Sequence, residues 1–185
     1  YVADDFRSED AFRRWIGPTY YSFNIGNIHY VLMDNTLFNN TGGTQGVLGN
    51  VQDYKQGFTS NEMKWLRADL QNVPAGSTIV FGTHIQYSTR ESLDASGTFN
   101  FSYALPLEFR KELMALFKSY DVHILSGHTH INYTNRINKN LIEHNLAAVC
   151  ATWWWTGSYT SGRCHICRDG SPGGYKVFEI GADGD

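Results

Sequence analysis

The fold of this chain is decided by the stretch Val122-His123-Ile124-Leu125-Ser126-Gly127-His128-Thr129-His130. Its first four residues form an apolar run typical of a short buried strand, and Gly127 permits a tight turn directly after it. His128 and His130 follow just beyond the strand end, where α/β proteins usually keep their functional groups. A buried core has little use for two neighbouring imidazoles, whereas a metal site does. The stretch therefore indicates a metal site on a loop.

A second strand with the same kind of ending lies earlier in the chain. Residues 78–81 are β-branched and apolar, and Gly82-Thr83-His84 follows them. Between the two strands, Pro106 suits the first turn of a helix. The apolar stripe of that helix comprises Phe109, Leu113, Leu116, Phe117 and Tyr120. Strand, helix and strand predict a β-α-β unit with parallel strands, which brings both histidine loops to one edge of a sheet. His84, His128 and His130 are therefore candidate metal ligands, and the alternative interpretation is that they are polar loop histidines with ordinary hydrogen bonds.

The other segments complete a mixed α/β pattern. Ser8 has the position of a cap for a short helix, and Thr59 and Glu62 have the spacing of a capping box. Asp34 and Asn35 end a strand and are expected to approach the site without acting as ligands. The further expected elements are strands over residues 20–25, 28–33 and 175–180, a strand or strand pair over 141–150, a long polar loop to about residue 58 and a polar turn over 135–140.

Length and charge bound the possible functions. The 185 residues fit one domain or an incomplete piece of a larger one. The net charge of -3 predicts no general attraction to nucleic acid or to anionic membranes. No apolar run approaches the roughly 20 residues that span a bilayer. The chain begins with Tyr1 instead of methionine, so any targeting segment is expected upstream.

Several motifs together resemble one family. Gly127-His128-Thr129-His130 resembles the Gly-His-x-His signature of the calcineurin-like metallophosphoesterases, and Gly82-Thr83-His84-Ile85 resembles the preceding histidine loop of that family. Residues 18–35 are similar to the middle of its fold. Residues 153–175, which begin with Trp153-Trp154 and continue through Cys167-x-Asp169-Gly170, are similar to bacterial members with accessory domains at both ends. The resemblance covers nearly all of the chain.

This resemblance implies a two-layer β-sandwich flanked by helices. It also implies two divalent transition-metal ions (Zn, Mn, Fe or Ni) and hydrolysis of a phosphomonoester or phosphodiester by a bridging hydroxide. By motif match, His84 and His128 would bind one metal and His130 the other. Tyr87 and Trp154 would lie near the mouth of the site and stack on the substrate. A periplasmic or otherwise extracytoplasmic location is implied by the same resemblance.

The acidic motifs of the family do not precede these loops. Its Asp-x-His, Gly-Asp and Gly-Asn-His motifs normally supply the carboxylate ligands, an Asn ligand and the acid histidine. Asp121-Val122-His123 matches the first as a string, but at about 3.3 Å per residue it lies more than 10 Å from the site. We therefore expect residues 1–185 to be the C-terminal half of a catalytic domain, which alone binds metal poorly and is inactive. The upstream half and accessory domains would be its partners.

Other interpretations stay open for the aromatic and cysteine residues. The run Trp153-Trp154-Trp155, with the missing acidic motifs, is also compatible with a non-catalytic glycan-binding or interaction module. Cys164 and Cys167 have the spacing of a zinc or redox pair, but no second pair accompanies them, which favours structural or incidental cysteines. The histidines within strand-like runs are interpreted as structural: His29, His123 and His144.

Overall fold

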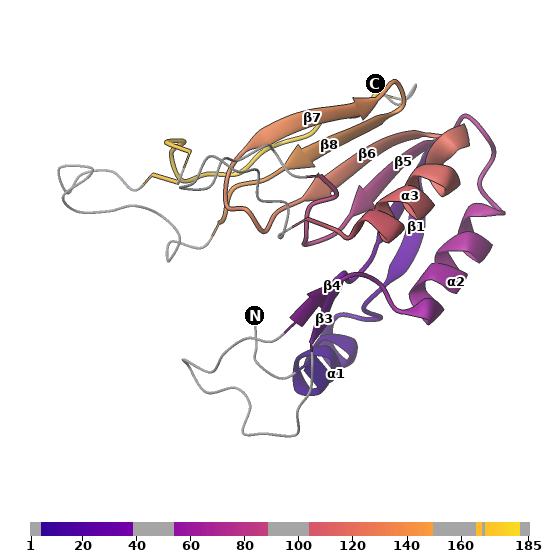
Figure 1. The fold of residues 1–185 in the computed structure, drawn as a ribbon, viewed down its shortest axis with the longest axis horizontal. Coiled ribbons are helices and arrows are strands. Elements are labelled where there is room, and N and C mark those ends of the chain that lie inside the picture. Colours follow the sequence, from indigo (N-terminus) through magenta and orange to yellow (C-terminus); the bar gives the residue numbers. More distant parts are fainter. Residues whose placement is uncertain (1–4, 39–53, 89–103, 150–165, 168, 182–185) are drawn as a thin grey trace.

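The computed structural model describes residues 5–38, 54–88, 104–149, 166–167 and 169–181. They form a six-stranded sheet with helices against one face, and a separate two-stranded ribbon near α1 (Figure 1). The elements are α1 (Asp5–Trp15), β1 (Tyr21–Ile25), β2 (Ile28–Leu32), β3 (Thr36–Phe38), β4 (Tyr54–Gln56), α2 (Ser60–Leu70), β5 (Thr78–Gly82), α3 (Leu107–Leu116), the 3-10 helix η1 (Phe117–Ser119), β6 (Asp121–Ser126), β7 (Tyr133–Asn138) and β8 (Leu141–Asn145). The predicted mixed α/β class is confirmed. The described part of the chain does not include the large second sheet of a sandwich.

The strand order β1-β2-β5-β6-β8-β7 places four mutually parallel strands at the centre of the sheet. The outermost strands β1 and β7 pair antiparallel with their neighbours. β5, α3 and β6 form the predicted β-α-β unit, with Gly82 in register with Leu125. Since β2, β5, β6 and β8 run in the same direction, the segments that follow them meet at one edge of the sheet. The histidine loops are two of these segments.

Alternating apolar residues on the central strands build the core on the helix side. Ile79 and Phe81 of β5 and Ile124 of β6 pack with Leu66 of α2 and Leu113 of α3, all of them buried. The capping box at the start of α2 is also confirmed, because Thr59 and Glu62 exchange side-chain to backbone hydrogen bonds. None of the described helices has the length and apolar character needed to cross a membrane.

Several expected elements were wrong. Ser8 lies inside α1, which already begins at Asp5. Most of the turn expected over residues 135–140 belongs to β7, which ends at Asn138 and leaves only two residues before β8. The strand expected over residues 141–150 is shorter, because β8 ends at Asn145. β7 is mostly polar, with Ile137 packed against the core, so its sequence lacks a regular apolar alternation, and pairing with β8 determines its conformation. The long polar loop contains the paired strands β3 and β4, and residues 175–180 form no strand.

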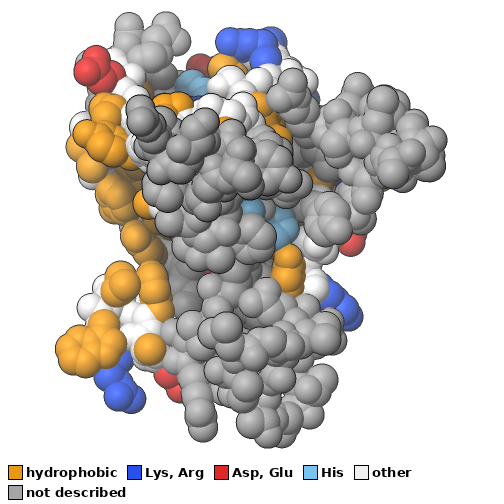
Figure 2. Space-filling view, turned by 90° about the vertical axis from the view of Figure 1, so that its left-hand side faces the viewer, with side chains coloured by type: hydrophobic (Ala, Val, Ile, Leu, Met, Phe, Trp, Pro, Cys, Tyr) orange, Lys and Arg blue, Asp and Glu red, His pale blue; other side chains and the backbone are white. Residues whose placement is uncertain are grey.

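The sheet face away from the helices exposes apolar side chains. Ser22 on β1 bonds to Asp69 of α2, so the alternating residues Tyr21, Phe23 and Ile25 lie on the opposite face. The Phe23 ring stacks on Tyr30 of β2 with centroids 5.0 Å apart, and Ile25 is 61% exposed. Hydrophobic side chains gather along one margin of the molecule in Figure 2. An apolar face of this kind is typical of a surface that another part of a protein covers.

Candidate functional site

The three predicted ligand histidines line one cavity at the edge where the parallel strands end. His84 follows β5, and His128 and His130 follow β6. The cavity has a volume of about 540 Å³, and residues 146–149 after β8 also line it. The structure thus brings together loops that are more than forty residues apart in the sequence. The β-α-β unit places them there.

The His84 and His128 rings form a hydrogen bond whose spacing is also compatible with two ligands on one metal ion. Nε2 of His84 and Nδ1 of His128 lie 3.2 Å apart, and the ring centres are 5.1 Å apart with the planes inclined at 76°. With metal–nitrogen bonds of about 2.05 Å and a tetrahedral angle, two imidazole nitrogens lie about 3.3 Å apart and their ring centres about 5.2 Å apart. Both observed distances agree with these values. The pair therefore fits joint ligation of one metal.

A second histidine pair in the same sheet has a different geometry. Nδ1 of His123 on β6 and Nε2 of His144 on β8 lie 3.1 Å apart, but these rings are nearly parallel, at 8°, with centres 5.4 Å apart. Each ring nitrogen lies about 1.15 Å from its ring centre. A hydrogen bond of 3.1 Å that lies in line with both centres therefore places the centres about 5.4 Å apart, as observed. The two nitrogens point at each other and not at a shared third atom. This geometry supports a structural role for both residues.

The backbone at the site is strained. His128 has a φ of 68° and His130 a φ of 58°, and they are the only non-glycine residues with positive φ among those the structure describes. A side chain in this left-handed region costs about 1–3 kcal/mol and persists where surrounding contacts impose it. Residues of this kind concentrate at functional sites. The strain therefore supports a functional role for the loop.

The imidazoles at the site are held in their neutral form. The His84 ring reaches solvent, yet surrounding protein atoms and the neighbouring His128 and His130 lower its pKa to about 4. Burial and His130 also lower the pKa of His128. Near neutral pH both rings are unprotonated, which is the state that binds metal.

The described lining of the cavity contains no carboxylate. Within the described ranges, no group of three or more His, Cys, Asp or Glu side chains converges in a way that could hold a metal ion. His130 lies in the same cavity as the converging pair and lowers the pKa of both its members. The three predicted ligands therefore lie in one cavity, and none of its described lining residues adds an acidic ligand.

Asn35 holds the His84 loop in place. Its Nδ2 donates to the Ile85 carbonyl at 2.8 Å, and the Ile85 N–H donates to its Oδ1 at 2.9 Å. Asn35 is fully buried after β2 and is not among the residues that line the cavity. This paired contact fixes the residue that directly follows His84.

Tyr54 contacts the other side of His128. Its hydroxyl lies 3.4 Å from His128 Nε2, and the two rings meet edge to face. Since Nδ1 of His128 faces His84, Tyr54 contacts the ring nitrogen on the opposite side and helps to fix the orientation of the ring. No motif predicted this contact, because it depends on how the β3–β4 ribbon lies against the sheet.

Tyr87 is a core residue, 4% exposed. Its hydroxyl donates to the Arg110 carbonyl at 2.8 Å, and burial raises its pKa to about 12. Trp154 and Cys164 lie outside the described residues, so the structure says nothing about substrate stacking or pairing there. Cys167 is buried and free.

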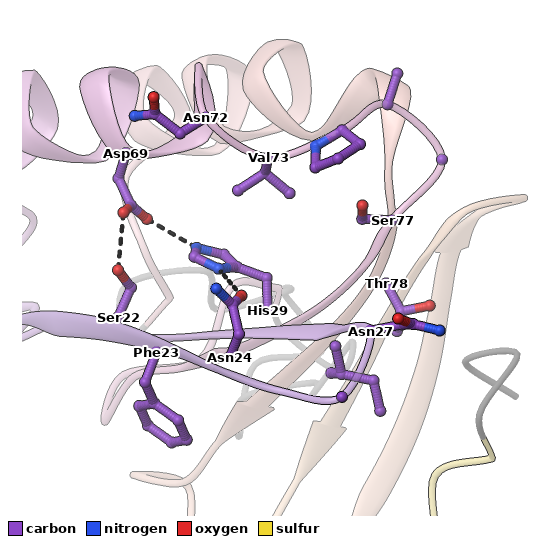
Figure 3. A pocket seen from close by; sticks show the side chains of 15 residues that line it. Ser22, Phe23, Asn24, Asn27, His29, Asp69, Asn72, Val73, Ser77 and Thr78 are labelled. Atoms are coloured by element: carbon purple, nitrogen blue, oxygen red, sulfur yellow. Dashed lines mark hydrogen bonds and ion pairs between the residues drawn. The ribbon is translucent and has the colours of Figure 1, made fainter.

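His29 belongs to a polar cluster at the opposite end of the strands (Figure 3). Nε2 of His29 and the Ser22 hydroxyl both bond to the Asp69 carboxylate at 2.8 Å, and Asn24 contacts the other ring nitrogen. The cluster borders a cavity of about 630 Å³. Ser22 donates to Asp69 and not to His29, so these residues lack the nucleophile–base contact of a hydrolase triad. The bonds join α2 to the β1–β2 hairpin, which is a structural role.

Comparison with known proteins supports the resemblance at the C-terminal end. Residues 143–184 match the family model described as the C terminal of calcineurin-like phosphoesterase. A dimetal phosphatase from Danio rerio is similar in structure, with a TM-score of 0.45 and 14% sequence identity over 70% of this chain. The similarity covers 49% of that protein, so this chain spans about half its length. No curated protein matches the chain.

Proposed function

We propose that this chain supplies the histidine ligands of a metal-dependent phosphoesterase that hydrolyses a phosphomonoester or phosphodiester. The observation that carries the proposal is the approach of His84 Nε2 to Nδ1 of His128, with the distances expected of two ligands on one metal. The match of residues 143–184 to the calcineurin-like phosphoesterase model supports the reaction class.

In this proposal His84 and His128 hold one divalent transition-metal ion, and His130 contributes to a second. Such ions supply the nucleophile and neutralise the phosphate oxygens in two-metal hydrolysis. The residues of this chain prepare the site for them. The low pKa of His84 keeps its ring unprotonated, Asn35 fixes the loop that follows it, and Tyr54 contacts the nitrogen of His128 that faces away from His84.

The missing carboxylate ligands and the acid histidine would come from an upstream half of the catalytic domain. That half is also the proposed occupant of the apolar sheet face that carries Phe23 and Ile25. Without it, the chain is expected to bind metal weakly and to be inactive. Accessory domains and an extracytoplasmic location stay predictions of the family resemblance.

The glycan-binding alternative has no support from the described residues. It depended on Trp153-Trp154-Trp155, which lie outside them, and on the missing acidic motifs, which a non-catalytic module shares with an incomplete catalytic domain. Polysaccharide binding that disappears in Trp154→Ala, in a protein that holds no metal, would favour it.

The test uses the full-length protein and its metal content. We expect bound transition metal, hydrolysis of p-nitrophenyl phosphate or bis(p-nitrophenyl) phosphate, and loss of both metal and activity in His84→Ala, His128→Ala and His130→Ala. His123→Ala is the matched control. His123 lies on β6, the strand that leads to the His128 loop, and its ring is hydrogen-bonded to His144 outside the cavity. Unchanged hydrolysis in His128→Ala and His130→Ala would overturn the proposal.

A further inference from the structure

β8 carries two fully buried polar side chains, Glu143 and Asn145. Neither is among the residues that line the histidine cavity. Burial of such groups is costly unless hydrogen bonds satisfy them. Both are satisfied, and every side-chain hydrogen bond that the structure gives them ends on one of the two histidine loops or at its base.

Asn145 bonds to residues on both sides of His128. Its Nδ2 donates to the Gly127 carbonyl at 2.6 Å and to Ser126 Oγ at 2.9 Å. The Thr129 hydroxyl donates to its Oδ1. His128 lies between these contacts in its left-handed conformation. One amide side chain therefore supplies the contacts that offset the backbone strain at a candidate ligand.

Glu143 extends this network to the other loop. Its Oε1 accepts from Ser126 Oγ at 2.8 Å and from the Tyr87 N–H at 2.6 Å. Its Oε2 accepts from the Ser88 N–H at 2.9 Å and from the Ser88 hydroxyl at 2.6 Å. Tyr87 and Ser88 lie three and four residues after His84. The carboxylate thus connects the segment after His84 to the base of the His128 loop.

The hydrogen bonds of this network have one direction. Thr129 donates to Asn145, Asn145 to Ser126, and Ser126 to Glu143. Each donor in the chain is oriented by the next acceptor, and the series ends on a carboxylate that can only accept. Such a chain has one arrangement of its hydrogens, which favours one arrangement of the loops.

We propose that Asn145 and Glu143 are positioning residues of the metal centre. They hold the two loops in one relative position, and so keep the facing nitrogens of His84 and His128 3.2 Å apart. The inference rests on the proposed function for the identity of the site. The positioning itself is a property of the metal-free protein and is tested separately.

The experiment compares variants of the full-length protein in two measurements. Asn145→Ala removes the amide, and Thr129→Val removes the hydroxyl that donates to it. Thr129→Ser keeps that hydroxyl and is the conservative control. Asp69→Asn disturbs the other polar cluster, at the far end of the strands, and controls for general loss of stability. The measurements are Co²⁺ affinity, from its visible absorption, and amide hydrogen exchange of the metal-free protein.

We expect Asn145→Ala to weaken Co²⁺ binding by about 10–100-fold, as for other residues that orient metal ligands. Thr129→Val should change it in the same direction, and Thr129→Ser and Asp69→Asn should stay within about twofold. Exchange over residues 126–130 should accelerate in Asn145→Ala and not in Asp69→Asn.

Unchanged exchange over 126–130 together with unchanged Co²⁺ affinity in Asn145→Ala would overturn the inference, as would an equal loss of affinity in Asp69→Asn. If the wild type binds no Co²⁺ but exchange over residues 126–130 still accelerates in Asn145→Ala, the proposed function is overturned and the positioning of the loops by Asn145 stays supported.

Discussion

The substitution Glu143→Gln replaces one oxygen acceptor of a fully buried side chain with an NH2 donor and preserves its shape. In the native chain each carboxylate oxygen accepts one backbone N–H, from Tyr87 or Ser88, and one hydroxyl. Whichever position receives the NH2 group, the hydroxyl there can rotate to accept, but the backbone N–H cannot. One buried N–H is therefore left facing another donor.

The magnitude follows from these contacts. An unsatisfied buried N–H costs about 1–3 kcal/mol, and the bonds that remain lose about 1 kcal/mol each when their acceptor is no longer charged. Relief from burying a carboxylate offsets part of this loss. We expect Glu143→Gln to lower the free energy of unfolding by about 2–4 kcal/mol.

Urea unfolding at pH 7 measures this loss, and Glu62→Gln is the matched control. Glu62 is also buried, but its bonds from the Thr59 N–H and hydroxyl both end on Oε2. A glutamine can turn its carbonyl to both, and it is accepted in capping boxes, so its cost should stay below about 1 kcal/mol. A loss below about 1 kcal/mol in Glu143→Gln, or an equal loss in both variants, would refute the reasoning.

Two further predictions concern packing and pH. Gly57→Ala should destabilise by about 2–4 kcal/mol in urea unfolding, because its φ is 147° and its Cβ would lie 2.5 Å from the Phe109 ring. Gly26→Ala, with a φ of 59° and open space around it, should cost only about 1–2 kcal/mol, and the reverse order would contradict the packing described. Burial, His123 and Lys176 lower the pKa of His144 below its ordinary 6.5. The unfolded chain therefore binds a proton that the native chain excludes, and stability should fall as the pH decreases below about 6.5. In His144→Gln, the free energy of unfolding should differ less between pH 5 and pH 7 than it does in the wild type. An unchanged difference would exclude His144 as the cause.

The parts of the fold that the sequence predicts are those with local signals. The β5–α3–β6 unit was predictable because apolar strands, a proline-initiated helix and glycine-ended loops follow one another, and parallel pairing then leaves few arrangements. The same logic placed His84 beside His128. The capping box at Thr59 was equally local.

The parts that were missed depend on contacts between distant segments. β7 is a strand because β8 pairs with it, and its mostly polar sequence has no regular apolar alternation to indicate this. Glu143 and Asn145 alternate with half-buried positions on β8 and share the face of the buried Leu141, so the period of a strand predicts that they point inward. Their partners could not, because these lie on loops that only the fold brings together. The contact of Tyr54 with His128 has the same origin.

Anomalous X-ray diffraction from metal-loaded full-length protein tests the shared metal most directly. Joint ligation predicts an anomalous peak about 2.0–2.2 Å from both Nε2 of His84 and Nδ1 of His128. A metal that binds without contacting these two nitrogens, while phosphoester hydrolysis persists, would contradict it.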